Sequence, residues 1–434
     1  MTMRLCGVLS SWVGVLVLGG GVCFGCVVVD DDEGLVRVRY FEPSGVRIDI
    51  NTLPKPYASR SARKGPHVVA VPEDPVLEVP KGFAVQVFAG DVPAARWLAL
   101  TPEGDVLCAS SRTNAIYLFK DTDGNGVADK RFVFLDKEHG CNLPFGMAFA
   151  DGGFFLGNTN GVYRYDYEPG MTSLTAERNK ITDLPGRGYG QHWTRNIVVS
   201  PDEKYLYITV GSKSNVGEEE PPRASVLRMK LDGSAREVFA SGLRNPVGMD
   251  VDPATGEVFV VVNERDGLGD DLVPDYLTRV RKGEFFGWPY AYLKPDWLDP
   301  RMLEEDGATS RNTELATKTR TPDVLFQSHS APLGMAIYDS TMFPKKYRGG
   351  AFVAFHGSWN RSSATGYKIV FVPFDPETHE PKGEYEDFVR GFLTDPSGPT
   401  AWGRPVGVLV MKDGSLLFAD DGNNRIYRVS YDEK

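Results

Sequence analysis

The chain has 434 residues, 41% of them hydrophobic, with 47 glycines and 30 prolines, which suits a large core built from short strands and turns. Its formal net charge of −10 argues against a nucleic-acid partner, because such a surface needs clustered basic residues. Length alone allows two or three domains, but an internal repeat favours a single folded body.

Residues 1–29 are expected to be a signal peptide or a lipoprotein-type anchor. Arg4 precedes the apolar stretch 8–22, which is too short and glycine-rich to predict a transmembrane helix. Gly25-Cys26 lies where a bacterial lipoprotein would be cleaved and acylated, although Cys23-Phe24 matches that signal poorly. Lipid anchoring, plain secretion and an uncleaved anchor are all left open. Each implies export to the bacterial periplasm, the cell envelope or the exterior.

Residues 30–79 are expected to form a linker and N-terminal extension, because acidic and basic runs and repeated prolines interrupt any pattern there. Residues 80–434 are expected to form the main domain. At its start, residues 82–88 alternate in polarity and predict a strand that closes the fold against the C-terminal end of the chain.

A short segment recurs six times in the main domain. Successive copies are separated by 48, 50, 52, 86 and 73 residues, when aligned on Leu98, Gly146, Asn196, Gly248, Gly334 and Gly407. Most copies continue through a turn into a second strand rich in β-branched residues. Four strands repeating every 40 to 50 residues are typical of propeller blades. We therefore predict an all-β fold, a six-bladed β-propeller of four-stranded antiparallel blades.

Two smaller features of the main domain allow two interpretations each. Cys108 and Cys141 could form a disulfide or remain one buried strand cysteine and one loop thiol. The loop 121–132 places oxygen-bearing residues at positions 1, 3, 5 and 9 of a calcium loop, namely Asp121, Asp123, Asn125 and Asp129. Position 12 is Phe132 instead of glutamate, so a hairpin turn with Asp and Asn bonded to their own backbone is the alternative.

Three histidines lie in loops that lead into the repeated strands. His192 directly precedes one of them, and His329 and His356 occupy comparable positions. Such loops meet at an end of the ring, where a propeller normally places its active site. His192 is the candidate general base, although a loop histidine more often only donates or accepts structural hydrogen bonds.

Six segments of the chain carry a family resemblance, at 191–216, 242–249, 263–277, 283–292, 355–368 and 402–408. In this order they resemble the soluble glucose/sorbosone dehydrogenases, and most closely the L-sorbosone dehydrogenase branch. The resemblance implies a six-bladed propeller that binds pyrroloquinoline quinone (PQQ) and Ca²⁺. It also implies oxidation of a sugar or sugar aldehyde, with electrons passed to a quinone or a cytochrome c.

The resemblance also implies roles for individual residues. His192 would be the base that takes the proton of the substrate hydroxyl. The cofactor contacts would be Arg244, Asn245, Arg361, Arg404, Trp402 and Asn142, with arginines against the PQQ carboxylates. A catalytic Ca²⁺ would take oxygen ligands from the loop 264–271, with Asp266, Asp270 and Asp271 as candidates.

The chain departs from the glucose-oxidising members at two positions beside the histidine. Gln191 stands where they have an aspartate, and Ser212 stands where they have a carboxylate that orients the imidazole. These changes put glucose as the substrate in doubt. A calcium-dependent lactonase-type hydrolase and a propeller that only binds ligands are the alternative functions. The substrate, the electron acceptor and the oligomeric state do not follow from the sequence.

Overall fold

The computed structural model describes residues 34–175, 177–186 and 192–432. The expected export segment 1–29 and Gln191 therefore lie outside the described residues. In the part of the chain that is described, no helix has the length and apolar character needed to cross a membrane.

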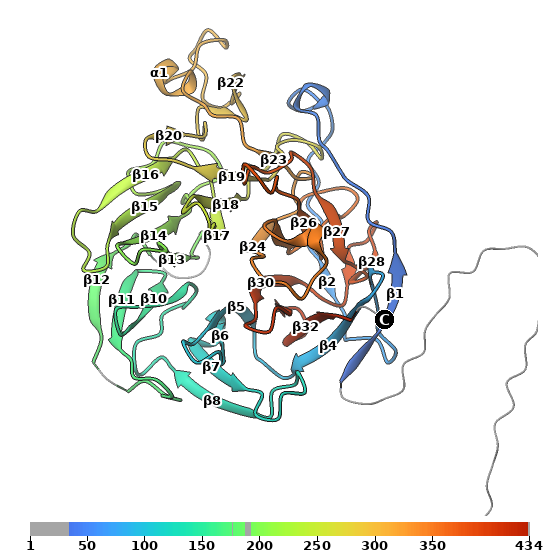
Figure 1. The fold of residues 1–434 in the computed structure, drawn as a ribbon. Helices are drawn as coiled ribbons and strands as arrows, with labels where there is room; N and C mark the ends of the chain where they lie inside the picture. The colour runs from blue at the N-terminus through green and yellow to red at the C-terminus, as the bar shows by residue number, and fades with distance from the viewer. Residues whose placement is uncertain (1–33, 176, 187–191, 433–434) are drawn as a thin grey trace, which may run out of the picture.

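The described residues form sheets arranged in a ring, and the chain runs around the ring once in sequence order (Figure 1). The first sheet consists of β5 (Ala95–Leu100), β6 (Val106–Ser110), β7 (Ala115–Lys120) and β8 (Lys130–Leu135). The second consists of β9 (Met147–Ala150), β10 (Gly153–Asn158), β11 (Gly161–Asp166) and β12 (Asn179–Asp183). The third consists of β13 (Ile197–Val199), β14 (Tyr205–Val210), β15 (Ser225–Lys230) and β16 (Glu237–Ser241), and the strand β20 (Glu284–Phe285) pairs parallel with β16.

The next two sheets repeat this antiparallel order. They are β17 (Pro246–Val251), β18 (Val258–Val262), β19 (Tyr276–Val280) and β23 (Val324–Leu325); and β24 (Pro332–Ile337), β25 (Ala351–Phe355), β26 (Lys368–Val372) and β27 (Glu386–Val389). The all-β class and the four-stranded antiparallel sheets are thus confirmed, in an arrangement consistent with a β-propeller.

The last sheet joins the two ends of the chain. Its strands β30 (Pro405–Val410), β31 (Leu416–Asp420) and β32 (Arg425–Tyr431) are followed in space by β4 (Phe83–Ala89), which pairs antiparallel with β32. The closing strand predicted at 82–88 is confirmed. Two further strands, β1 (Leu35–Phe41) and β3 (Val76–Pro80), extend this sheet from within the residues expected to be a linker.

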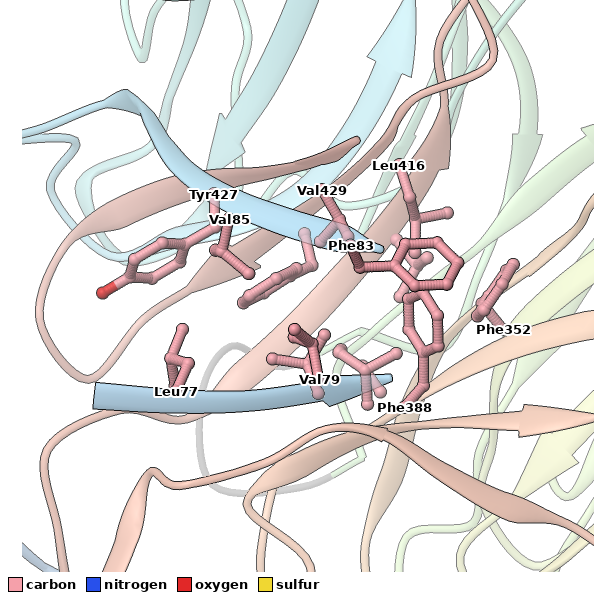
Figure 2. Close-up of a cluster of buried hydrophobic side chains, with 14 of the residues drawn as sticks. Leu77, Val79, Phe83, Val85, Phe352, Phe388, Leu416, Tyr427 and Val429 are labelled. Atoms are coloured by element: carbon pink, nitrogen blue, oxygen red, sulfur yellow. The ribbon is translucent and has the colours of Figure 1, made fainter. Parts of the chain in front are cut away.

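The N-terminal strands belong to the sheet because their side chains enter its core (Figure 2). Leu77 and Val79 are fully buried there. Phe83 is 1% exposed, and its ring meets the rings of Phe343 and Phe388 edge-on, with centroids 4.9 Å apart in each pair. Residues of the extension therefore help to hold the closing strand in place, beyond simply connecting it.

Smaller elements fill the insertions between the repeats. They include β2 (His67–Val68), β28 (Leu393–Asp395) and β29 (Thr400–Ala401) in one sheet, β21 (Ala291–Tyr292) and β22 (Lys294–Leu298) in another, the helix α1 (Thr313–Ala316), and 3-10 turns at Ile50–Thr52, Ser111–Thr113 and Lys345–Tyr347. α1 and β22 project beyond the ring (Figure 1). Cys108 and Cys141 are both buried and free, so the disulfide left open by the sequence is absent.

In four of the six copies the aligned position is a glycine, and it lies where one innermost strand approaches the next. A Cβ atom on Gly334 in β24 would lie 1.9 Å from the carbonyl oxygen of Val406 in β30. A Cβ on Gly407 in β30 would lie 2.5 Å from the carbonyl oxygen of Arg96 in β5, which is the first copy of the repeat. The last copy thus contacts the first, and the absence of a side chain allows the backbones to approach closely.

We predict that Gly334→Ala destabilises the protein by roughly 3 kcal/mol, the upper end of the usual cost of overpacking, because backbone must move to admit the methyl group. Gly90→Ala is the matched control, since its Cβ would meet nothing within 4 Å, and its effect should stay within about 0.5 kcal/mol. Urea unfolding followed by tryptophan fluorescence measures both. Equal stability of the two variants would contradict the interpretation of the repeat.

Candidate active site

A cavity of about 380 Å³ opens where the innermost strands begin. Most of its lining is polar, and five of the sheets contribute to it. Arg96 and Leu333 lie in the strands β5 and β24, and the other residues lie in the loops that enter β13, β17, β24 and β30 or follow β18 and β25. The lining residues are Arg96, His192, Arg244, Asn245, Asn263, Glu264, Asp266, Asp275, His329, Ala331, Leu333, His356, Gly357, Trp359, Asn360 and Arg404. The loops predicted to meet at an end of the ring therefore do so.

A chain of hydrogen bonds fixes the imidazole of His192. Its Nδ1 lies 3.0 Å from Oγ of Ser212, and this hydroxyl donates its own hydrogen to the carbonyl oxygen of Ser214 at 2.7 Å. Because the hydroxyl has only one hydrogen, it must accept from the imidazole, so Nδ1 carries the proton. Nε2 is then left with a lone pair, as a base requires.

The surroundings of His192 also keep it neutral. Burial, and next the nearby Arg244 guanidinium, hold the pKa of His192 well below its usual value. At neutral pH the ring is therefore unprotonated at Nε2 and ready to accept a proton. The orientation that a carboxylate would give is supplied here by a neutral hydroxyl.

Asn245 approaches His192 because the residue between them has no side chain. A Cβ on Gly211 would lie 2.4 Å from Oδ1 of Asn245 and 2.6 Å from Cβ of His192. Oδ1 of Asn245 is buried and has no hydrogen-bond partner among the described residues. Such an orphaned acceptor beside a cavity is a candidate ligand contact.

Arg244 is held by the chain itself. Its guanidinium donates to the carbonyl oxygens of Asn215 at 3.1 Å and Glu264 at 2.6 Å, and it pairs with Asp266 at 3.1 Å. The residue is 6% exposed. It therefore presents a fixed edge to the cavity beside Asn245 rather than a free side chain.

A second ion pair lies on the opposite wall of the cavity. Arg96 pairs with Asp421, and Asp421 also accepts from Nε2 of His356 at 2.8 Å. The side chains of Arg96 and Asp421 are each 9% exposed. Hydrogen bonding and the neighbouring cations hold the pKa of Asp421 far below its ordinary value despite burial, which acts in the opposite direction.

Arg404 differs from the other two arginines. Its Nε donates to the carbonyl oxygen of His356 at 3.3 Å, and within the described part of the chain it forms no ion pair. Burial lowers its pKa, but an arginine stays protonated at neutral pH. Arg404 is thus the cation of this cavity that can take an acidic ligand without giving up a carboxylate.

Asp266, Asn360 and His329 form one polar network at the rim. Asn360 donates to the Asp266 carboxylate and lies 3.1 Å from Nδ1 of His329. Nε2 of His329 lies 2.9 Å from the carbonyl oxygen of Gly269 and must donate to it. His329 is therefore a neutral structural residue, and burial lowers its pKa accordingly.

The structure brings together five of the predicted site residues, which are His192, Arg244, Asn245, Asp266 and Arg404. Three predicted cofactor contacts do not line this cavity. Arg361 pairs with Asp271 at 2.6 Å, Trp402 is in the core with Nε1 donating to Gly391, and Asn142 is exposed. Their similarity to family positions gave no information on which way these side chains turn.

The predicted calcium ligands are not assembled. Asp270 accepts from Ser362, Asp271 pairs with Arg361, and Asp266 pairs with Arg244. Asp121 accepts from the backbone N–H groups of Gly124 and Gly126, and Asp123 accepts from that of Asn125. Asp129 accepts from Thr122, so the loop 121–129 has the hydrogen bonds of the hairpin alternative. Over residues 34–175, 177–186 and 192–432, no group of three or more His, Cys, Asp or Glu could hold a metal ion.

Sequence reasoning missed Arg96, Asp421 and the acceptor role of Ser212. Arg96 begins the first copy of the repeat and could have been found there. Asp421 is 65 residues from its partner His356, and no local pattern joins them. Asp275 was also missed as a lining residue, and burial raises its pKa to about 8. Burial likewise raises the pKa of Glu264, which belongs to the predicted loop 264–271, to about 7.

The ring of antiparallel sheets and the cation-lined cavity at its mouth define a propeller with a candidate site for a small acidic ligand. A family model described as TrAA12-like matches residues 77–274 and 296–432. The chain belongs to this TrAA12-like family of soluble PQQ-dependent sugar dehydrogenase-like proteins.

Individual relatives agree with this family. An uncharacterized protein of Borreliella burgdorferi is 30% identical over 368 residues, which cover 82% of this chain and 91% of that protein. A pyrroloquinoline quinone-dependent pyranose dehydrogenase of Coprinopsis cinerea is 24% identical over 426 residues, and these cover 81% of this chain. The match covers only 54% of that enzyme's length.

Solved structures share the fold at low identity. The holo form of the PQQ domain of the Coprinopsis cinerea pyranose dehydrogenase has a TM-score of 0.68 at 20% identity, covering 84% of this chain and 99% of that chain. The PQQ-bound aldose sugar dehydrogenase of Streptomyces coelicolor has a TM-score of 0.57 at 17% identity, covering 82% and 100%.

We predict that Asp421→Asn destabilises the protein by about 3 kcal/mol at pH 7, because it leaves the buried Arg96 guanidinium without its anion. Asp413→Asn is the control, since Asp413 pairs with Arg428 while 47% exposed, and its cost should stay below about 1 kcal/mol.

The effect should depend on pH. The folded-state pKa of Asp421 is lowered, so its stabilisation is complete above the unfolded value of about 3.9 and is lost as the pH falls through the lower folded value. Unfolding curves of both variants between pH 7 and pH 3 measure this. If the free energy of unfolding of Asp421→Asn fell further below that of the wild type as the pH was lowered, the role given to the Asp421 carboxylate would be contradicted.

Proposed function

We propose that the chain is a six-bladed propeller enzyme that oxidises a sugar or sugar aldehyde with PQQ as cofactor. The observation that carries the proposal is the presence, in one cavity, of a neutral histidine whose Nε2 keeps its lone pair and of Arg404, which has no acid partner among the described residues. Family membership and the names of the Coprinopsis and Streptomyces proteins support the same activity.

The residues of the cavity suit a small polyanion. Arg404 can bind a carboxylate with two N–H groups, and Arg96 and Arg244 add positive charge on two other walls. Oδ1 of Asn245 and Nε of Arg96 are buried there and have no hydrogen-bond partner among the described residues. When bound here, PQQ would supply the two-electron acceptor that takes a hydride from the sugar carbon.

His192 would remove the proton of the reacting hydroxyl. Nε2 is the acceptor, and Nδ1–H stays bonded to Ser212, so the ring can take a proton without turning. Charge then developing on the ring is opposed by Arg244, which favours return of the proton once the substrate has reacted. The imidazole would therefore return to its neutral form at neutral pH and could act as a base again.

Four finer points belong to the same proposal. We propose a sugar other than glucose, because Ser212 replaces the orienting carboxylate of glucose-oxidising members, and an L-sorbosone-type substrate in particular, because the sequence most closely resembles that branch. Transfer of electrons to a quinone or cytochrome c is supported only by the family resemblance, and export with possible lipid anchoring is supported only by the sequence of residues 1–29. Ca²⁺ also stays a prediction, and no step is assigned to it because the candidate aspartates are separately paired.

Reconstitution tests the proposal. We expect the protein to bind PQQ with loss of free quinone absorbance, and a panel of aldoses and sorbosone to bleach the bound quinone. Parallel samples with Ca²⁺ and with a chelator decide whether calcium is required. Failure to bind PQQ would contradict the proposal and favour the lactonase-type or ligand-binding alternatives.

His192→Ala should lower kcat by about 10²–10⁴-fold while PQQ binding is retained, because only the base is removed. His67→Ala, at an exposed histidine in β2, is the matched control and should behave as wild type. Because the pKa of His192 is lowered, the acid limb of kcat/KM should lie well below pH 6.5. Wild-type turnover by His192→Ala would refute the assignment.

A further inference from the structure

We propose that Glu219 is the positioning residue for His192, and that it acts through the backbone of residues 213–214. The inference rests on the proposed function of His192 as a base. It assigns to this chain a carboxylate that orients the imidazole without touching it. The observation behind it is an unbroken series of hydrogen bonds from Glu219 to Nδ1 of His192.

Glu219 holds the turn that follows Ser212 with both of its carboxylate oxygens. Oε2 accepts from the backbone N–H of Lys213 at 2.6 Å, and Oε1 accepts from that of Ser214 at 2.6 Å. Oε1 also accepts from the Ser214 hydroxyl at 2.7 Å. Three bonds to an ionised acceptor are stronger than bonds between neutral groups. They fix the orientation of the peptide groups on both sides of Lys213.

The turn transmits this orientation to the histidine. The carbonyl oxygen of Ser214 accepts the Ser212 hydroxyl hydrogen at 2.7 Å, which decides where the lone pairs of that hydroxyl point. One of them meets Nδ1–H of His192 at 3.0 Å. If the Ser214 carbonyl turned away, the hydroxyl could donate to Nδ1 instead. Nε2 would then carry the proton and could not act as a base.

The turn has little other support. Residues 211–215 belong to no strand, and Lys213 and Ser214 are exposed. The backbone N–H of Ser212 donates to Arg244, and Asn215 bonds Asp266, so both ends of the turn are anchored while its middle depends on Glu219. Removal of the carboxylate would leave the middle free to change conformation.

The neighbouring glutamates do not share this role. Glu218 accepts from the Tyr290 hydroxyl at 2.9 Å, on the side of the insertion 284–330. The side chain of Glu220 forms no hydrogen bond or ion pair in the described part of the chain and is exposed. Glu220→Gln therefore removes the same charge one position away from the turn and serves as the matched control.

The test reads the tautomer of His192 directly. Histidine ring nitrogens labelled with ¹⁵N show by NMR which nitrogen carries the proton, and the spectrum of His192→Ala identifies the signals of His192. The protein is measured without PQQ and again with PQQ and a sugar that it oxidises. Wild type and Glu220→Gln should show the Nδ1–H tautomer alone.

Glu219→Ala should show a mixture of tautomers and a kcat lowered about tenfold, with KM changed less than about twofold, because orientation and not sugar binding is lost. Glu219→Gln should lie between, since its amide oxygen can accept one of the N–H groups and its NH₂ cannot accept the other. If circular dichroism shows that Glu219→Ala does not fold, the tautomer of His192 and the kcat of Glu219→Gln test the inference instead.

Two results would overturn the inference. One is a wild-type tautomer in both Glu219 variants, and the other is a changed tautomer with an unchanged kcat in an active enzyme. The NMR comparison does not need turnover. A protein that oxidises no sugar would therefore refute the proposed function, while the tautomers would still decide whether Glu219 orients His192.

Discussion

The contact between successive innermost strands is the constraint on which the rest of the structure depends. At Gly146, Gly248, Gly334 and Gly407 the backbone of one sheet lies so near the next that a methyl group would overlap with it. This spacing brings the starts of the strands into one small mouth. The loops that precede those strands therefore face one another. The polar cavity is a consequence of how closely the backbones pack.

In so narrow a cavity the positive charges of the arginines need partners, and most of them are paired with carboxylates of the chain. Three arginines line the cavity, and buried charges without partners are costly. Arg244 has Asp266 and Arg96 has Asp421. Arg404 has a carbonyl oxygen and stays without a carboxylate in the described residues. The site is therefore electrostatically complete except at one point, and that point is where an acidic cofactor group would gain the most.

The sequence could predict features that depend on neighbouring residues, but not contacts between residues that are far apart in the chain. The repeat, the closing strand and His192 are encoded locally, by glycine spacing, alternation and the position of a loop before a strand. Arg361 and Arg404 look alike in sequence, since each follows a family motif. They differ because Arg361 has Asp271 within 2.6 Å, and an acid supplied from 90 residues away is invisible without the fold. Trp402 likewise does not line the cavity, since its ring is buried against Phe392, and a family motif does not show which way a side chain turns.

Ser212, which stands where the glucose-oxidising members have a carboxylate, changes what the histidine gains from its hydrogen-bond partner. A carboxylate partner both orients an imidazole and raises its pKa, whereas a hydroxyl only orients it. Burial and the nearby Arg244 lower the pKa of His192, and no carboxylate partner offsets them, so the ring is unprotonated over a wide range of pH but accepts a proton with a smaller driving force. As the proposed base, His192 would suit a hydroxyl that is more acidic than an ordinary alcohol. The anomeric hydroxyl of a sugar and the hydrate of a sugar aldehyde are of this kind, and a simple alcohol is not.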